Sequence, residues 1–463
     1  MPENKAFWLA FIVLMVIAAS YSFGFDEKQI IAITILSSFI LGTLLFWNQR
    51  LAFAFLGVST LLFFGVLDVD HFVHFASLDI ISFLIAMMVF IGYLEKNNFF
   101  EFLISRLIPP LASRPKIMLA VLLIASAFFA AIVDEVTSIL FILSVVFNLT
   151  GRLRINPVPF VLMVVFATNI GSSATAIGNP IGVMIALKGG FSFSDFLLNA
   201  APISIISLFI TILVCFFLFR KEIAEMERRI FEMKKQKLFE DTDINIYIIK
   251  SAILFITIFT LLVFHHQIEE TLGLAKNTTL LGAAFIGAGM ALLLEREKAR
   301  TLLESRVDWW TLIFFIMLFS SVGALKYVGV TSWAADKAVS SFGSEREVLT
   351  AVVFFSSGIL SAMLDNVLAV ATFIPVLEGI DALGISSNSL WWALLFGGTL
   401  FGNLTIIGST ANIVAVGIAE RNWNLKIGFL EWIRAGAVVT LLTTSVALIL
   451  IYAQSGLLGG VYG

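Results

Sequence analysis

The stretch TNIGSSATAIGNP, residues 168–180, lies in the middle of an apolar segment that extends from 158 to 187. The whole segment is long enough to cross a bilayer, for which a helix needs about 20 residues. Its centre nevertheless contains glycines, a proline, two asparagines and several hydroxyl side chains, so we expect a helix that breaks near mid-membrane. Irregular backbone at that depth is tolerated only where it is buried in protein or lines a water-filled cavity. We interpret the stretch as a binding site made of two half-helix ends; a kinked structural helix is the alternative.

The composition is that of an integral helical membrane protein. Of the 463 residues, 59% are hydrophobic and 13% are charged, and the mean hydropathy is +1.01. Cys215 is the single cysteine, which excludes an internal disulfide framework and a multi-cysteine metal site. The four histidines are expected in loops, which argues against a zinc cluster: His71, His74, His265 and His266.

Hydropathy predicts eleven membrane spans. The first is kept as a span and not as a cleaved signal peptide, because no clear small-residue cleavage site follows it. The eleven expected spans are 6–22, 29–47, 50–66, 79–94, 156–187, 200–219, 247–264, 275–294, 308–324, 390–417 and 433–453.

Two further apolar stretches, 117–150 and 347–380, are interrupted at the centre by Asp134-Glu135 and by Asp365-Asn366. We expect arms of roughly 15–17 residues, which are short for full crossings. Both stretches are therefore predicted to be re-entrant hairpins that enter and leave the membrane on one side.

The distribution of basic residues fixes an expected orientation. With two hairpins, 23 of the 29 lysines and arginines fall on one side of the membrane, and this side is predicted to be cytoplasmic. The N-terminus and a linker, 220–246, then lie in the cytoplasm. The linker mixes seven basic and seven acidic residues between 220 and 243, which predicts a solvated helix between two halves.

The two halves of the sequence repeat at a shift near 230 residues. Asp79 matches Asp308 at the head of a span, Asp134 matches Asp365, and TAIG at 175–178 matches TIIG at 405–408. Each repeat contains five spans and one hairpin, so an odd number of crossings inverts the second copy. We predict an extra N-terminal transmembrane helix (1–28), a first inverted repeat (29–219), the cytoplasmic linker (220–246) and a second inverted repeat (247–463).

The expected fold is therefore all-α and membrane-integral, with an interrupted helix at mid-membrane in each repeat. Inverted repeats with interrupted helices are typical of secondary transporters, whose substrate and coupling ions bind near the midplane. Half-helix N-termini favour anions, whereas C-termini and unwound carbonyls favour cations such as Na⁺. Neither break contains a lysine or arginine, which slightly favours a small or weakly charged substrate. The candidate substrate-binding residues are Asn169, Gly171, Ser172, Ser173, Thr175, Gly178, Asn179, Asn403, Thr405, Gly408, Ser409, Thr410 and Asn412.

Carboxylates at the hairpin tips are the candidate coupling groups. A carboxylate at mid-depth costs several kcal/mol unless it is paired, hydrated or protonated; the alternative role is to cap the returning half-helix. We hypothesise that Glu135 binds a proton or helps to hold Na⁺. The candidate coupling residues are Asp134, Glu135, Thr137, Asp365 and Asn366, and Na⁺ is expected near Asp134, Asn169, Asp365 and Asn403.

Four motifs together resemble one family: AAIVDEVTSILF, TNIGSSATAIGNP, SAMLDNVLAVATFIP and WWALLFGGTLFGNLTIIGSTANIVAVGIAE. They are similar to the permeases of arsenite efflux pumps and the melanosomal P protein, within the ion-transporter superfamily that includes citrate and dicarboxylate symporters. The resemblance covers the chain from about residue 29. It implies a homodimer with a scaffold part and a moving transport part, and it implies that hairpin tips and unwound loops form the site. We expect the protein to lie in the plasma membrane. The first tip departs from the Asp-Asn-Val pattern of 365–367, because it reads Asp-Glu-Val at 134–136.

The resulting functional prediction is a secondary transporter of a small anion or oxo-species, arsenite-like or a carboxylate, coupled to H⁺ or Na⁺. The alternative is a Na⁺/H⁺ antiporter that binds the cation at the tip carboxylates. A channel would need a continuous polar pore. An intramembrane aspartyl protease would need Gly-x-Gly-Asp, which precedes neither Asp134 nor Asp365, so no enzyme is expected. We expect no organic cofactor and no nucleic-acid partner, and the phosphate-binding motif of an ATPase is absent, although a separate ATPase subunit remains conceivable.

Overall fold

The computed structural model describes residues 2–232, 244–423 and 425–458, and all of its regular elements are helices. The described chain forms two compact units. Unit 1 comprises residues 1–85, 305–349 and 371–387, and unit 2 comprises 86–304, 350–370 and 388–463.

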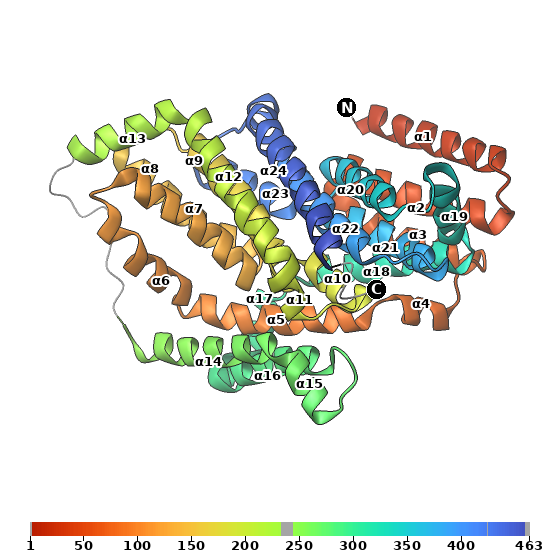
Figure 1. Cartoon of the computed structure of the whole chain (residues 1–463), viewed down its shortest axis with the longest axis horizontal. Coiled ribbons are helices and arrows are strands. Elements are labelled where there is room, and N and C mark those ends of the chain that lie inside the picture. The colour runs from red at the N-terminus through yellow and green to blue at the C-terminus, as the bar shows by residue number, and fades with distance from the viewer. Residues whose placement is uncertain (1, 233–243, 424, 459–463) are drawn as a thin grey trace. The chain divides into compact units, whose positions relative to one another are not determined.

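Unit 1 is built from long helices, three of which are apolar enough to be candidate membrane spans, with shorter helices between them (Figure 1). Asp26 caps the second helix through a reciprocal pair of hydrogen bonds with Gln29, a capping box that satisfies two otherwise unpaired N–H groups. Its helices are α1 (Pro2–Ser22), α2 (Glu27–Leu45), α3 (Arg50–Phe63), α4 (Val69–Phe75), α18 (Trp309–Tyr327) and α19 (Val330–Phe342), with the 3₁₀ turn η1 (Trp47–Gln49).

Four helices contain residues of both units: α5 (Leu78–Lys96), α17 (Ala299–Arg306), α20 (Arg346–Met363) and α21 (Asn366–Ala382). The remaining helices belong to unit 2. They are α6 (Phe99–Leu107), α7 (Pro115–Ile132), α8 (Glu135–Leu153), α9 (Val158–Ser172), α10 (Pro180–Gly189), α11 (Phe193–Asp195), α12 (Ala201–Leu218), α13 (Arg220–Glu232), α14 (Ile246–Val263), α15 (His265–Leu272), α16 (Thr278–Glu295), α22 (Asn388–Leu400), α23 (Thr410–Trp423) and α24 (Phe429–Leu458). Short turns complete it: η2 (Pro109–Leu111), the π-helical η3 (Phe196–Ala200), η4 (Arg296–Lys298) and η5 (Phe401–Asn403).

The structure confirms an all-helical chain with eleven candidate membrane spans among the described residues. Their identities differ in part from the expected set. By length, three of the eleven are hairpin arms (α7, α8 and α20), whereas the expected span 50–66 is the 14-residue α3. Three of the four hairpin arms are longer than the predicted 15–17 residues: α7 and α20 have 18 residues and α8 has 19, whereas α21 has 17. Length therefore does not distinguish these arms from full crossings.

Both predicted breaks are present in unit 2. Helix α9 ends at Ser172 and α10 begins at Pro180; α22 ends at Leu400 and α23 begins at Thr410. All 15 residues of α9 are buried, and so are the residues of α22 from Ser389 onward. A helix that is apolar on every side belongs in the interior, so the two broken helices form the core of this unit and hold their open ends inside it.

Two expectations about polar segments need correction. The four histidines lie in the short helices α4 and α15 and not in loops. Helix α13, the described first half of the linker, is solvated on one face only, because Ile223, Met226 and Ile230 are buried at helical spacing. Helix α13 lies against α7, α8 and α12 (Figure 1). The rest of the linker, 233–243, lies outside the described residues.

Candidate functional site

The two acids of the first hairpin tip, Asp134 and Glu135, have different structural roles. Asp134 is the N-cap of α8, where its Oδ1 accepts a hydrogen bond from the Thr137 N–H at 2.8 Å. This is the capping role that was the alternative to ion binding. Glu135 is the first residue of α8, and its side chain is buried, with 1% of its surface exposed. The deeper group of the pair is therefore Glu135.

The Glu135 carboxylate is surrounded by neutral donors from three other segments. Ser172 at the end of α9 donates to Oε2 at 3.2 Å. Asn366 at the start of α21 and Ser409, just before α23, each approach Oε1 at 3.4 Å. The second hairpin tip and both breaks thus meet at one carboxylate, and all of these residues lie in unit 2.

Asn169 connects the two breaks directly. Its Nδ2 donates to Asn403 Oδ1 at 2.7 Å and to Asn412 Oδ1 at 2.8 Å, and its Oδ1 accepts from Ser409 Oγ at 3.1 Å. Asn169, Asn403 and Asn412 are all 0% exposed. A buried amide needs partners for both its N–H and its C=O, and Asn169 finds them only because the two repeats meet here.

Asn179 and Asn412 form hydrogen bonds with the backbone at the ends of the two breaks. Asn179 is the N-cap of α10, where its Oδ1 accepts from the Gly182 N–H at 2.8 Å, and its Nδ2 donates to Ser172 Oγ at 2.9 Å. Asn412 Nδ2 donates to the carbonyls of Gly402 and Thr405, both at 2.8 Å. Both side chains therefore satisfy backbone groups that the broken helix leaves unpaired.

Equivalent threonines fasten each break to its own hairpin. The Thr175 hydroxyl donates to the Ala131 carbonyl, and the Thr405 hydroxyl donates to the Ala362 carbonyl. The same bond therefore recurs in both copies at the predicted repeat shift. Each hairpin tip and its break are joined locally as one element.

The second tip has its own acid, which is held differently from Glu135. Asp365 is 9% exposed; its Oδ1 accepts from the Val367 N–H at 2.9 Å and its Oδ2 accepts from Thr410 Oγ1 at 2.8 Å. It therefore joins the start of α21 to the start of α23. Asn366 occupies the position in the second tip that Glu135 occupies in the first. The second tip therefore contributes an amide to the contacts around Glu135, while its acid, Asp365, bonds with Thr410 instead.

Not every predicted residue faces this centre. The Ser173 hydroxyl bonds with Ser204 of α12 at 2.9 Å and with the Ile170 carbonyl, and Thr137 contributes its backbone N–H. Gly171, Gly178 and Gly408 allow backbone segments to approach closely: a Cβ on Gly171 would lie 2.1 Å from the Ala127 carbonyl oxygen of α7.

Several contributing residues were missed by the sequence interpretation. Trp432 of α24 donates its indole N–H to the Asn403 carbonyl at 3.1 Å. Ser126 of α7 bonds with Thr168 Oγ1 at 2.7 Å, and Ser361 of α20 donates to the Gly398 carbonyl at 2.5 Å. The two serines are polar residues within apolar hairpin arms, which is a usable signal, whereas Trp432 has no such mark in the sequence.

The electrostatics of the site come from backbone and carboxylates. Helices α8, α21 and α23 begin at residues that contact or adjoin the Glu135 carboxylate, and α10 begins one bond further away through Asn179 and Ser172. Each helix N-terminus carries roughly half a positive charge. Among the described residues, the hydrogen-bond partners of Glu135 are hydroxyls and an amide, with no lysine or arginine paired to it. Likewise, no cluster of three or more His, Cys, Asp or Glu suitable for a metal is found within the part of the chain that the structure describes.

Replacement of Asn169 by alanine is expected to destabilise the junction of the two breaks. It removes the donor that both Asn403 Oδ1 and Asn412 Oδ1 share, and each orphaned buried acceptor costs about 1–3 kcal/mol. We expect a total loss of about 2–4 kcal/mol, seen as a lower apparent unfolding temperature in detergent. The control is Asn97→Ala, whose amide bonds only locally, to the Tyr93 carbonyl in the last turn of the preceding helix α5. Equal effects of the two substitutions would contradict the cross-repeat role of Asn169.

Comparison with known proteins agrees with this architecture. A family model described as a citrate transporter, CitMHS, matches residues 40–397. An uncharacterized transporter of Mycobacterium tuberculosis is 33% identical over 379 residues, which cover 81% of this chain and 85% of that protein. The human P protein is 26% identical over 444 residues, covering 80% of this chain and 52% of the P protein, so this chain spans about half of that relative.

Among solved structures, the Alcanivorax borkumensis YdaH transporter has the same fold, with a TM-score of 0.57 at 16% identity, and the match covers 84% of this chain and 87% of that one. The resemblance to the P protein and to citrate transporters that the four motifs indicate is confirmed. Because the family model matches well over half of the chain, this protein belongs to the CitMHS citrate transporter family and is a membrane transporter.

Proposed function

We propose that the chain is a secondary active transporter that moves a small anion or oxo-species by alternating access, with Glu135 as the coupling group. The observation that carries this proposal is the position of Glu135, a buried carboxylate that touches both breaks and the opposite hairpin tip through Ser172, Ser409 and Asn366. A group that contacts both repeats senses any movement of one repeat relative to the other. Binding of a proton or Na⁺ to Glu135 therefore shifts the equilibrium between the conformational states of the transporter.

The energetics explain why Glu135 needs a proton or a cation. An ionised carboxylate in a membrane interior costs several kcal/mol unless it is neutralised, and hydroxyl or amide donors lower this cost without removing the charge. A proton on either carboxylate oxygen, or a Na⁺ held by oxygens, neutralises it. Nearby oxygens suited to Na⁺ include the Asn169 and Asn403 amides and the unwound backbone carbonyls of the breaks.

The substrate class follows from the charges around the site. Four helix N-termini offer partial positive charge, which suits an oxo-species or a singly charged carboxylate. The described partners of the network include no lysine or arginine, so a multiply charged anion would lack the ion pairs that usually hold it. An arsenite-like neutral species or a small carboxylate fits better than a free tricarboxylate.

A specific observation favours the second candidate, a Na⁺/H⁺ antiporter. Asp134, Glu135 and Asp365 bring three carboxylates to the two hairpin tips, and each accepts hydrogen bonds only from neutral donors. Carboxylate, amide and carbonyl oxygens are the ligands of hard cations. In this case Na⁺ is the transported species and no anion takes part.

Reconstituted vesicles separate the two candidates. The protein is placed in proteoliposomes with a pH-sensitive dye inside, and Na⁺, K⁺, arsenite or citrate is added outside. We expect a substrate-dependent flux of arsenite or of a carboxylate that requires a H⁺ or Na⁺ gradient. A luminal pH change on addition of Na⁺ but not K⁺, with no anion substrate present, would instead identify the antiporter. Flux of arsenite or citrate that is independent of both gradients would refute secondary transport.

We also place the N-terminus and the linker 220–246 on the cytoplasmic side of the plasma membrane. Two ion pairs support this assignment, because they join residues that the charge distribution puts on the same side: Lys96 with Glu295, and Lys116 with Glu227. The same proposal includes a homodimer as the working assembly, as in similar permeases. Cysteine accessibility at exposed positions of α13 tests the orientation.

A further inference from the structure

A second polar site lies at the far end of α8. Glu135 begins this helix and Arg154 is its C-cap, 19 residues later, so the two ends are about 28 Å apart at 1.5 Å per residue. A pocket of about 340 Å³ opens there between the α8–α9 connection and the first turns of α13. Its lining includes Arg154, Asn156, Phe160, Lys221, Glu222 and Glu225. The volume is within the range of small-molecule sites.

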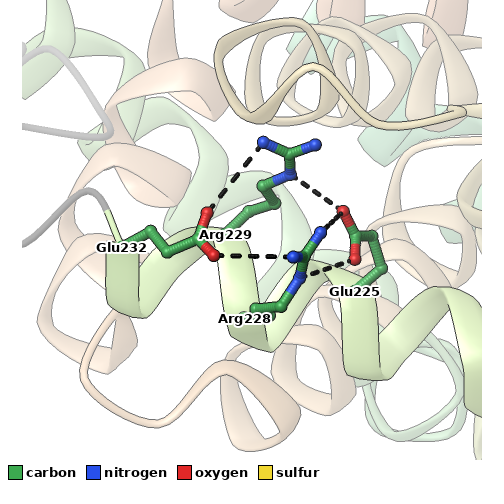
Figure 2. Close-up of polar contacts among 4 residues, drawn as sticks. All are labelled: Glu225, Arg228, Arg229 and Glu232. Carbon is green, nitrogen blue, oxygen red and sulfur yellow. Dashed lines mark hydrogen bonds and ion pairs between the residues drawn. The ribbon is translucent and has the colours of Figure 1, made fainter.

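One of the two acids in the lining is already neutralised. The Glu225 carboxylate accepts from Arg228 Nε at 2.9 Å and Nη2 at 2.7 Å, and from Arg229 Nε at 2.8 Å (Figure 2). These hydrogen bonds, first from Arg228 and then from Arg229, lower the pKa of Glu225 below its usual value. Glu232 completes the cluster from the next turn, at 3.7 Å from Arg228 Nη1 and 3.9 Å from Arg229 Nη1 (Figure 2).

The other three charged groups of the pocket have no such partner. Within the described ranges, Arg154, Lys221 and Glu222 form no side-chain hydrogen bond or ion pair. Arg154 and Lys221 are exposed, and Glu222 is half-buried. The pocket therefore presents two cations and one anion to a ligand, together with the aromatic ring of Phe160 in its wall.

Both cations of the pocket closely follow candidate membrane spans. The candidate span of α8 ends at Leu153, one residue before Arg154, and the span that contains α12 ends at Leu218, three residues before Lys221. Basic residues that directly follow apolar spans lie at the membrane interface, and basic pockets between such helices bind lipid headgroups. Both cations of the pocket thus belong to the headgroup layer.

We propose that this pocket binds the headgroup of a membrane phospholipid of the ethanolamine type. Arg154 and Lys221 contact the phosphate, and Glu222 accepts hydrogen bonds from the primary ammonium. The charges of the pocket favour this class of lipid. A phosphate alone would pair with Arg154 and Lys221 but would leave the Glu222 carboxylate without a partner, whereas a zwitterionic headgroup pairs with all three side chains. Because Arg154 follows α8 and Lys221 lies in the first turn of α13, the bound lipid joins the linker helix to the end of α8 that lies farthest from the hairpin tip.

Native mass spectrometry of the delipidated full-length protein tests the proposal. Phosphatidylethanolamine, phosphatidylcholine and phosphatidylglycerol are titrated separately, and inorganic phosphate is added as a competitor. We expect phosphatidylethanolamine to bind more tightly than phosphatidylcholine, which has the same phosphate but no ammonium N–H. Arg154→Gln and Lys221→Gln are each expected to weaken its binding about fivefold, the usual worth of one basic residue near a lipid surface. The matched control is the exposed pair Lys298→Gln and Arg300→Gln, which should leave binding unchanged.

Glu222→Gln separates the two halves of the headgroup. It should abolish the preference for phosphatidylethanolamine over phosphatidylcholine while leaving binding of phosphatidylglycerol unchanged or tighter. Unchanged affinity in the Arg154→Gln/Lys221→Gln double variant, confirmed as folded by gel filtration, would overturn the proposal. Displacement of the lipid by inorganic phosphate would show that a free phosphate and not a lipid is the ligand, and a preference for phosphatidylglycerol in the wild type would overturn the role of Glu222.

Discussion

Glu135→Gln is expected to uncouple transport from its driving ion. Glutamine keeps the shape of the side chain and can still bond with Ser172, Ser409 and Asn366, but it neither takes up a proton nor carries a charge for Na⁺. A ligand shifts a conformational equilibrium only through its differential affinity for the two states. Coupling free energies of 1–3 kcal/mol correspond to about 5- to 150-fold changes, so we expect gradient-driven flux to fall within this range and to lose its pH dependence.

The stability of this variant makes the prediction sharper. Loss of a structural group would lower the unfolding temperature. Removal of a buried carboxylate that has no cationic partner among the described residues should leave the unfolding temperature unchanged or raise it, most of all at alkaline pH, where the carboxylate is ionised. Flux against pH in proteoliposomes and the apparent unfolding temperature in detergent are measured on the same preparation.

Asp134→Asn provides the matched control one residue away. Asp134 caps the Thr137 N–H, and asparagine caps a helix about as well as aspartate. We therefore expect a nearly normal pH profile for Asp134→Asn. A wild-type profile for Glu135→Gln, or the same loss in both variants, would remove Glu135 from the coupling mechanism.

Gly171→Ala is expected to have the largest effect on stability. A Cβ at this position would lie 2.1 Å from the carbonyl oxygen of Ala127 and 2.3 Å from its Cα. Both are backbone atoms of α7, so neither rotates away and no replacement at 127 removes them. Overpacking costs typically 1–3 kcal/mol and occasionally more; because backbone meets backbone here, we expect a loss of about 3 kcal/mol or more, with little folded protein recovered.

Gly289→Ala in α16 is the control for the glycine prediction. Its Cβ would have no heavy atom within 4 Å, and alanine favours a helix over glycine by about 1 kcal/mol. This variant should be as stable as the wild type or slightly more so, by apparent unfolding temperature and by yield of monodisperse protein. Normal folding of Gly171→Ala would show that α7 and α9 do not pack as closely as described.

Much of the site could be predicted from local sequence, because its signals are local. The composition of 168–180 and 402–412 marks the breaks, and an acid between two apolar arms marks each hairpin tip. The partners within the site could not be predicted. Asn169 pairs with Asn403 and Asn412, more than 230 residues away, and nothing in either segment specifies which amide meets which.

The lengths of the helices also could not be predicted from the sequence pattern. Hydropathy cannot show where α3 stops, because the apolar run continues past Phe63 into residues that are not helical. It also underestimates the hairpin arms, because polar residues such as Thr150 and Arg152 continue α8 to Leu153. The different roles of Asp134 and Glu135 could not be predicted from the sequence, because they depend on where each side chain points. Neighbouring residues point in different directions.

The pairing of Glu135 with Asn366 has a consequence for how such a protein can originate. Two identical half-length chains placed antiparallel would bring the same residue to this contact twice: two acids that repel each other, or two amides that carry no charge. Symmetry imposes that identity on any homodimer. Fusion of the halves into a single polypeptide removes this constraint, so that one copy can retain the acid while the other carries a shorter, uncharged amide.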